Sequence, residues 1–170
     1  MVYMGGPLSG AHYNPAVSAA VTLRGKMGPE MIFYMAVQTL AAFAACLTVF
    51  MLEGEFTGII IAPGVGSAMG TLFKETLLTF VLCFVILNVA TSKATEGNQY
   101  FGLAIGATLA AIAHIGMCFN PAIAIASAVV DLFQGAQAIS SVWIFIVGPM
   151  MGGALAAFAY ALINPSEVGA

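Results

Sequence analysis

Long apolar stretches constrain this chain more than any other feature of its sequence. Four of them, at residues 30–52, 70–91, 101–117 and 139–163, carry few charged side chains. At a rise of ~1.5 Å per residue, helices of about this length cross the ~30 Å hydrocarbon core of a bilayer. Only 6% of the 170 residues are charged and 61% are hydrophobic, so polar side chains cannot coat a water-facing surface. The sequence therefore predicts an all-α integral membrane protein surrounded by a lipid bilayer.

The few charges and cysteines exclude several functional classes. The net charge is −3 and the four basic residues are scattered, so no basic stripe is available for nucleic acid. The three cysteines are isolated, and no Cys/His cluster has the spacing of a metal site. The sequence also contains no phosphate-binding glycine loop and no nucleophile with a base. We therefore expect no cofactor, no metal, no enzymatic activity and no nucleic-acid partner, and we expect any transport to be passive.

Two shorter apolar segments are half-helices by their length. Residues 14–23 and 120–130 would each extend only ~15 Å as helices, about half of the bilayer core. They also repeat each other, because HYNPAV at 12–17 and CFNPAI at 118–123 share an aromatic residue, Asn, Pro, Ala and an aliphatic residue. The first precedes the first full span and the second lies between the third and fourth spans. The two segments should therefore enter from opposite faces, as in an inverted repeat.

Asn followed by Pro marks the start of a helix. Asn is among the best N-cap residues, and Pro fits the first helical position because its missing N–H would have no partner there. Each half-helix then directs the positive end of its dipole toward the membrane midplane. Two such ends repel cations, while the amides of Asn14 and Asn120 can donate hydrogen bonds to a small neutral permeant. We expect the preceding segments, 10–13 and 116–119, to be extended and to present carbonyl acceptors along the same path.

The motifs SGAHYNPAV and FNPAI resemble those of the aquaporin, or major intrinsic protein, family. The similarity continues in AVQTLAAFAA at 36–45, KETLLTFVL at 74–82, GLAIG at 102–106 and VWIFIVGPMMGGALAAFAY at 142–160. It implies an aquaporin-like right-handed helical bundle, here with four full spans plus two re-entrant half-helices. It also implies a water channel that usually assembles as a homotetramer with one pore per subunit.

The chain departs from the family pattern in three respects. The two full spans that the family places before its first motif are missing ahead of Asn14. Ile123 stands where the family has an Arg in its outer selectivity filter, and the loop before the second motif is short. We expect one channel domain over 1–170, with the remainder of the first repeat at 1–52 and the second repeat at 71–163. An outer loop at 53–70 and a tail at 164–170 complete it.

The candidate pore-lining residues surround the two motifs. They are Gly10, Ala11, His12, Tyr13, Asn14, Pro15, Ala16, His114, Cys118, Asn120, Pro121, Ala122 and Ile123. His12 either contacts the permeant or supports the first loop, and His114 is either a filter residue or a core histidine. By resemblance, Glu75 and Gln38 are structural, with the Glu75 carboxylate bracing a half-helix loop through backbone N–H bonds. The alternative for the two asparagines is ordinary helix capping without a pore.

The leading functional interpretation is a passive water channel that also admits other small neutral solutes. Ions would be excluded by the opposed dipoles and the two asparagines. A glycerol-type channel is less favoured, because such relatives carry an Asp shortly after the second motif, where Ile123, Ala124 and Ile125 stand here. The alternative is a truncated, non-conducting structural or assembly component of the membrane.

The basic residues indicate the orientation. When the segments between spans are assigned to alternating sides, Arg24, Lys26 and Lys93 fall on one side and Lys74 on the other. Because basic residues favour the cytoplasmic face, the side of Arg24 and the C-terminus is expected to be cytoplasmic. The predicted location is a plasma or inner membrane.

Overall fold

The computed structural model describes residues 1–54, 67–116, 118–133, 135 and 138–167, and these ranges contain helices and no strand. The helices are α1 (Val2–Ser9), α2 (Pro15–Leu23), α3 (Met31–Glu53), α4 (Ala68–Ala90), η1 (Lys93–Thr95), α5 (Phe101–Ala113), α6 (Pro121–Asp131), α7 (Ile144–Ile163) and η2 (Pro165–Glu167). The predicted all-α fold class is confirmed. Most of the expected outer loop and the end of the expected tail lie outside the described residues.

The four predicted spans are all helical, but the third is shorter than expected. Helices α3, α4 and α7, of 23, 23 and 20 residues, are long and apolar enough to cross a membrane. Helix α5 has only 13 residues, and it ends because the chain turns at His114 and Ile115 and Gly116 adopts a left-handed φ of 76°. The last span also begins later than predicted, at Ile144, after turns at residues 139–143. Of the four predicted full spans, three are of full length among the described residues and the third, α5, is shorter.

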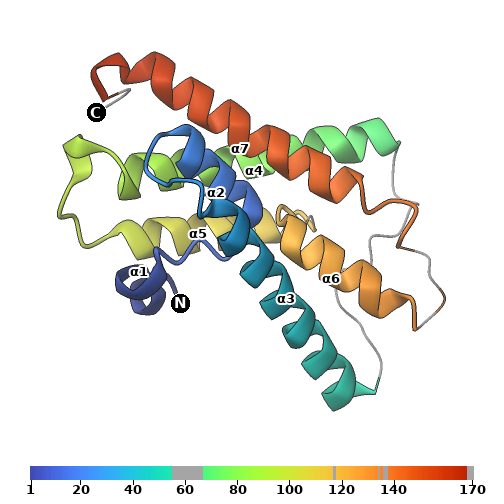
Figure 1. Ribbon diagram of the computed structural model, residues 1–170. Helices are drawn as coiled ribbons and strands as arrows, with labels where there is room; N and C mark the ends of the chain where they lie inside the picture. Colours follow the sequence, from blue (N-terminus) through green and yellow to red (C-terminus); the bar gives the residue numbers. More distant parts are fainter. Residues whose placement is uncertain (55–66, 117, 134, 136–137, 168–170) are drawn as a thin grey trace.

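The two halves of the chain are intertwined through the half-helices (Figure 1). Helices α4 and α7 pack along each other and form the most extensive helix pair, and α5 packs against α4. The half-helix α2 of the first half packs against α7 of the second half, and the half-helix α6 of the second half packs against α3 of the first. Each half-helix is therefore held by a long helix that lies far from it in the sequence.

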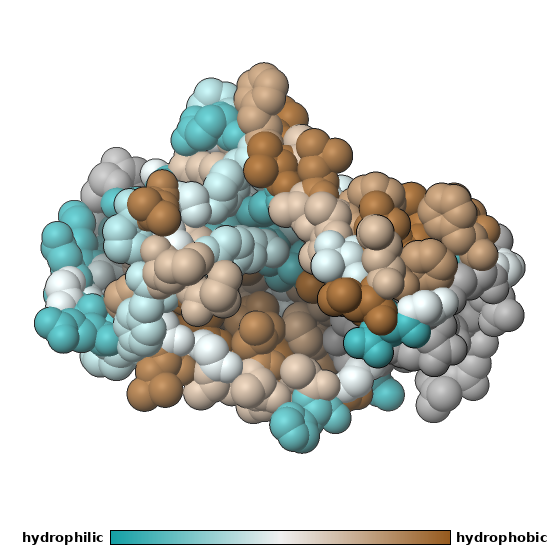
Figure 2. All heavy atoms as spheres, turned by 90° about the horizontal axis from the view of Figure 1, so that it is seen from below, coloured by the Kyte–Doolittle hydropathy of each residue, from teal (hydrophilic) through white to brown (hydrophobic). Residues whose placement is uncertain are grey.

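The exterior of the bundle is apolar. Figure 2 shows several hydrophobic patches on one face, with hydrophilic residues between them. On α3, large apolar side chains are exposed at Ile32, Phe33, Val37, Leu40 and Leu52. Such a surface is unfavourable in water and suits lipid, so the chain is an integral membrane protein.

Glycines on α7 allow it to lie close to its neighbours. A Cβ atom on Gly152 would overlap the carbonyl oxygen of Thr76 and would lie 2.8 Å from the backbone nitrogen of Phe80 on α4. A Cβ on the adjacent Gly153 would lie 2.5 Å from the carbonyl oxygen of Ala16 at the start of α2. Both contacts involve backbone atoms, which cannot move aside as a flexible side chain can. These two glycines therefore set the distance from α7 to both α4 and the first half-helix.

Replacing Gly152 by Ala should therefore destabilise the bundle. The added methyl group forces α7 away from α4, and overpacking of this kind costs about 1–3 kcal/mol. The matched control is Gly106→Ala on α5, where a Cβ would meet nothing within 4 Å. Thermal unfolding in detergent should show a lower midpoint for Gly152→Ala and no loss for Gly106→Ala. Equal midpoints for the two variants would contradict close packing at Gly152.

Candidate pore

Both half-helices begin with the same side-chain cap. The Asn14 Oδ1 atom accepts a hydrogen bond from the Ala16 N–H at 2.9 Å, and Asn120 Oδ1 accepts one from the Ala122 N–H at 3.1 Å. Both asparagines have extended backbone angles, and a Pro follows each of them in the first turn. The N-caps predicted from the Asn-Pro pairs are therefore present. They place the positive ends of two helix dipoles at the asparagines.

The two caps also bind each other's loops. The Asn14 Nδ2 atom donates to the carbonyl oxygen of Phe119 at 2.8 Å, and the Asn120 Nδ2 atom donates to the carbonyl oxygen of Tyr13 at 2.9 Å. These reciprocal bonds bring together two motifs that are about a hundred residues apart in the chain. A side-chain amide has two N–H donors, so these bonds leave each Asn a second N–H.

The residues before the two asparagines have a backbone conformation that differs from the prediction. Tyr13 and Phe119 have positive φ angles of 52° and 39°, in the left-handed region that non-glycine residues rarely adopt. Ala11 shares it, with φ of 52°. The segments 10–13 and 116–119 were expected to be extended, which is wrong at these positions. The left-handed turn aims the Tyr13 and Phe119 carbonyls at the opposite Asn, and the bonds formed there offset the backbone cost of roughly 1–2 kcal/mol.

A buried carboxylate holds the second loop. Glu75 on α4 is fully buried, and its Oε1 and Oε2 atoms accept hydrogen bonds from the backbone N–H groups of Cys118 and Phe119, each at 2.7 Å. Both oxygens are used, and both partners lie directly before Asn120. This is the bracing contact that the resemblance implied for Glu75.

A neutral network supports the first loop. The Gln38 Nε2 atom of α3 donates to Ser18 Oγ at 2.9 Å, and the His12 Nδ1 atom lies 3.1 Å from the same oxygen. The Tyr34 hydroxyl donates to the Ser9 carbonyl at 2.8 Å, and its ring meets the His12 ring edge-on. His12 therefore has structural contacts, and Gln38 contacts the same Ser18 on α2.

A cavity of about 950 Å³ lies beside the two caps. Seven of the predicted residues line it: Gly10, Ala11, His12, Tyr13, Asn14, Asn120 and Ile123. Its apolar wall includes Val17 and Val21 of α2, Leu82 and Ile86 of α4, and Ile105 of α5. One end is lined by the segment that follows α4, including Ser92 and Asn98. The cavity thus combines a polar strip at the caps with aliphatic walls.

The other predicted residues do not line this cavity. Pro15, Ala16, Pro121 and Ala122 form the buried first turns of the half-helices. Cys118 was expected to face the pore, but it is fully buried, because Glu75 holds its N–H and its side chain packs in a cluster with Ala124 and Phe145. His114 is exposed, with Nδ1 2.9 Å from the Ala110 carbonyl oxygen. It is therefore not a core histidine, and it does not line this cavity.

Several cavity residues were missed in the sequence analysis. Val17 and Val21 are four residues apart on α2, and Leu82 and Ile86 are four apart on α4, as expected for neighbours on one helix face. Leu82 also lies seven residues after Glu75, so the helical period places it on the same face. That spacing could have identified these residues once Glu75 had been oriented toward the loops.

The arrangement offers uncharged hydrogen-bonding groups next to two helix N-termini. Among the described residues, no three His, Cys, Asp or Glu side chains are grouped so that they could hold a metal ion. The polar groups at the caps are amide N–H donors and backbone carbonyl acceptors, which carry no net charge. Two dipole ends next to them give a positive potential, worth about 0.3–1 kcal/mol for each unit charge and helix end.

Comparison with known proteins gives consistent results. The chain is 36% identical over 169 residues to the glycerol uptake facilitator protein-like 6 of Lactiplantibacillus plantarum, a match covering 92% of this chain and 76% of that protein. It is 35% identical to aquaporin NIP1-1 of Zea mays over 96% of this chain, but it spans only 58% of that protein. The solved structure of the aquaglyceroporin from Plasmodium falciparum has the same fold, with a TM-score of 0.80, 24% identity and coverage of 98% of this chain and 78% of that one.

The family model called Major intrinsic protein matches residues 1–160. This range includes both asparagine-capped half-helices, all of α3 and most of α7. Together with the relatives above, it shows that the chain belongs to the major intrinsic protein family.

Proposed function

We propose that this chain forms a passive membrane channel for water and other small neutral solutes and that it excludes ions. The observation that carries the proposal is the reciprocal pair of bonds by which Asn14 and Asn120 join two half-helix N-termini at the wall of one cavity. A permeant at this point meets amide donors and carbonyl acceptors, so a neutral hydrogen-bonding molecule is solvated there. A cation meets two positive dipole ends.

The cavity wall favours a channel that admits other small solutes besides water. Ile123 lines the cavity next to the second cap, and Leu109 of α5 lines it as well. Both are aliphatic, so this part of the wall offers no charge and no extra donor. Small carbon-containing solutes should therefore pass with water, which agrees with the similarity to a protein named a glycerol uptake facilitator.

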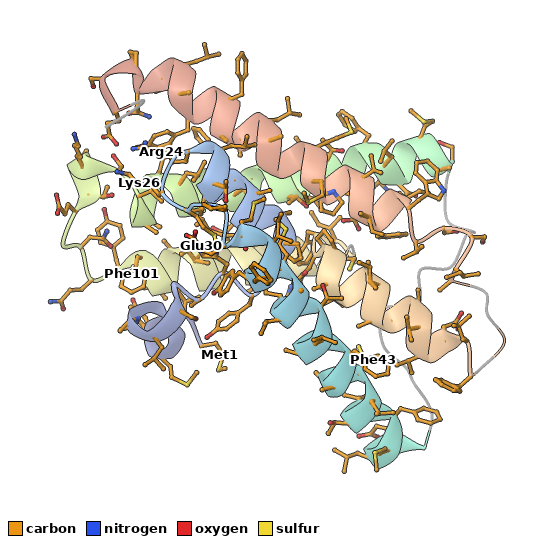
Figure 3. All side chains as sticks on the ribbon, viewed as in Figure 1. Met1, Arg24, Lys26, Glu30, Phe43 and Phe101 are labelled. Atoms are coloured by element: carbon orange, nitrogen blue, oxygen red, sulfur yellow. The ribbon has the colours of Figure 1, made fainter. Side chains whose placement is uncertain are left out.

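The ends of the molecule support the proposed orientation. Arg24 hydrogen-bonds to Glu167 in the C-terminal turn, and the backbone N–H of Lys93 donates to the same residue. Figure 3 shows Arg24 and Lys26 at this end of the bundle. We place this end in the cytoplasm, in a plasma or inner membrane, because basic residues favour that face. A homotetramer remains part of the proposal by family resemblance.

Asn120→Asp should weaken ion exclusion. Asp is also a good N-cap, so the bond to the Ala122 N–H can persist, but the carboxylate adds a negative charge and loses the donor to Tyr13. We expect cation flux through the channel to rise relative to the wild type. Potential-driven cation uptake into proteoliposomes measures it, and osmotic shrinkage measures water flow in the same vesicles.

The control for this experiment is Asn164→Asp, which makes the same change outside the cavity, beyond the end of α7. It should leave cation flux at the wild-type level. If Asn120→Asp is folded and both its cation flux and its water flow equal those of the wild type, the caps do not form an ion barrier.

Ile123→Arg should narrow the selectivity. A guanidinium remains charged and presents five donors, so it both fills space and competes for the hydrogen bonds of larger solutes. Glycerol permeability should fall more than urea permeability, and urea permeability more than water permeability. One liposome assay with the three solutes, corrected for protein content, gives these ratios.

The uncharged variant Ile123→Met serves as the control, because it keeps nearly the same volume. It should keep the wild-type ratios among the three solutes. Equal ratios in Ile123→Arg would show that residue 123 does not face the permeant.

A further inference from the structure

A single carboxylate connects three separate parts of the chain at the end of the bundle that carries Arg24. Glu167 lies in the turn after α7, and its Oε2 atom accepts hydrogen bonds from Arg24 Nη2 at 2.6 Å and from the Tyr160 hydroxyl at 2.8 Å. Its Oε1 atom accepts from Ser92 Oγ at 3.1 Å and from the Lys93 backbone N–H at 3.2 Å. The partners therefore come from the end of α2, from α7 and from the start of η1.

This cluster is shielded from solvent. Arg24 and Glu167 are exposed by only 6% and 8%. The Arg24 guanidinium also donates from Nη1 to the Glu167 carbonyl oxygen at 2.8 Å, and it lies over the Tyr160 ring at 4.7 Å from the centroid. Breaking a buried ion pair strongly destabilises the folded protein, because the remaining buried charge loses its partner. The side chains of this cluster are therefore held more firmly than those of a surface salt bridge.

The cluster adjoins the end of the cavity. Ser92 and Lys93 begin the segment that connects α4 to α5, and both line the cavity together with Glu96 and Asn98 further along it. Glu167 itself does not line the cavity. Its carboxylate acts on the cavity only through the segment that it holds.

We infer that Glu167 is a positioning residue that fixes the α4–α5 segment at one mouth of the cavity and so keeps that mouth open. The inference rests on the proposed channel function. Without the carboxylate, Ser92 and the Lys93 N–H lose this partner. The segment keeps its bonds to the end of α4, from Thr95 to the Asn88 carbonyl and from Asn98 to the Val89 carbonyl, but it loses its tie to the turn after α7 and can move further across the opening. If the freed segment spends about half its time there, flow falls about twofold.

The hydrogen bonds of the Glu167 carboxylate should persist over the ordinary pH range. The hydrogen bond from the Tyr160 hydroxyl is the largest influence that holds the pKa of the Glu167 carboxyl below its usual range. Arg24 and Tyr160 are the ionisable side chains that donate to this carboxylate. A lowered pKa means that the stabilisation is complete above the ordinary glutamate pKa of ~4.3 and is lost as the pH falls through the folded value.

The test combines segment mobility with transport. A spin label on Ala94→Cys, an exposed residue of the segment that does not line the cavity, reports mobility in proteoliposomes, while osmotic shrinkage reports water permeability. We expect Glu167→Ala, which removes both side-chain oxygens, to increase label mobility and to lower permeability per folded channel about twofold. Tyr160→Phe removes one donor and keeps the ring under Arg24. It should also increase label mobility and lower permeability, but by smaller amounts. Between about pH 8 and pH 5 the parent channel carrying only the label should show constant mobility.

The control is Glu30→Ala, which makes the same change in a carboxylate whose described bonds are local, to the backbone N–H groups of Gly28 and of Glu30 itself. It should leave mobility and permeability unchanged. Unchanged mobility in Glu167→Ala, or increased mobility with unchanged permeability, would overturn the inference. A parent channel without water flow would refute the proposed function, whereas the mobility comparison would still test whether Glu167 holds the segment.

Discussion

The reciprocal bonds between each asparagine and the loop of the opposite motif are the constraint on which the rest of the structure depends. Backbone groups inside a membrane must find partners within the protein, because lipid offers none. Two helices that begin near the middle of the bundle therefore need caps, and their loops need acceptors and donors. Asn14 and Asn120 meet both needs at once, since Oδ1 caps its own helix and Nδ2 binds the other loop.

The two loops are supported by different chemistry. The loop before Asn120 is held by the two oxygens of Glu75, whereas the described partners of the loop before Asn14 are neutral, with Ser18 and Tyr34 among them. Removing the Glu75 carboxylate would leave two buried N–H groups unpaired, each costing about 1–3 kcal/mol. The neutral contacts are weaker individually, so the second loop is expected to be the more rigidly fixed of the two.

The sequence predicted what local rules determine and missed what depends on distant contacts. Asn-Pro at both motifs identified the starts of α2 and α6 to the residue. The end of α5 was not predicted, because the apolar pattern continues past Ala113 while the backbone turns at His114. Local position also suggested that Cys118 faces the pore, but its orientation is set by Glu75, 43 residues earlier. The bond between Arg24 and Glu167, 143 residues apart, has no signal in either local sequence.

The balance between the caps and the aliphatic wall explains how such a cavity could conduct. A fully polar path would bind each permeant too well to release it, whereas a fully apolar path would exclude water. Here the described polar contacts at the centre come from the caps, while Val17, Leu82 and Ile86 offer no hydrogen bonds. A water molecule in the proposed pore would therefore meet donors and acceptors on one side only. It would keep a hydrogen bond to the next water along the path. The free-energy barriers to entry and to release would therefore be similar.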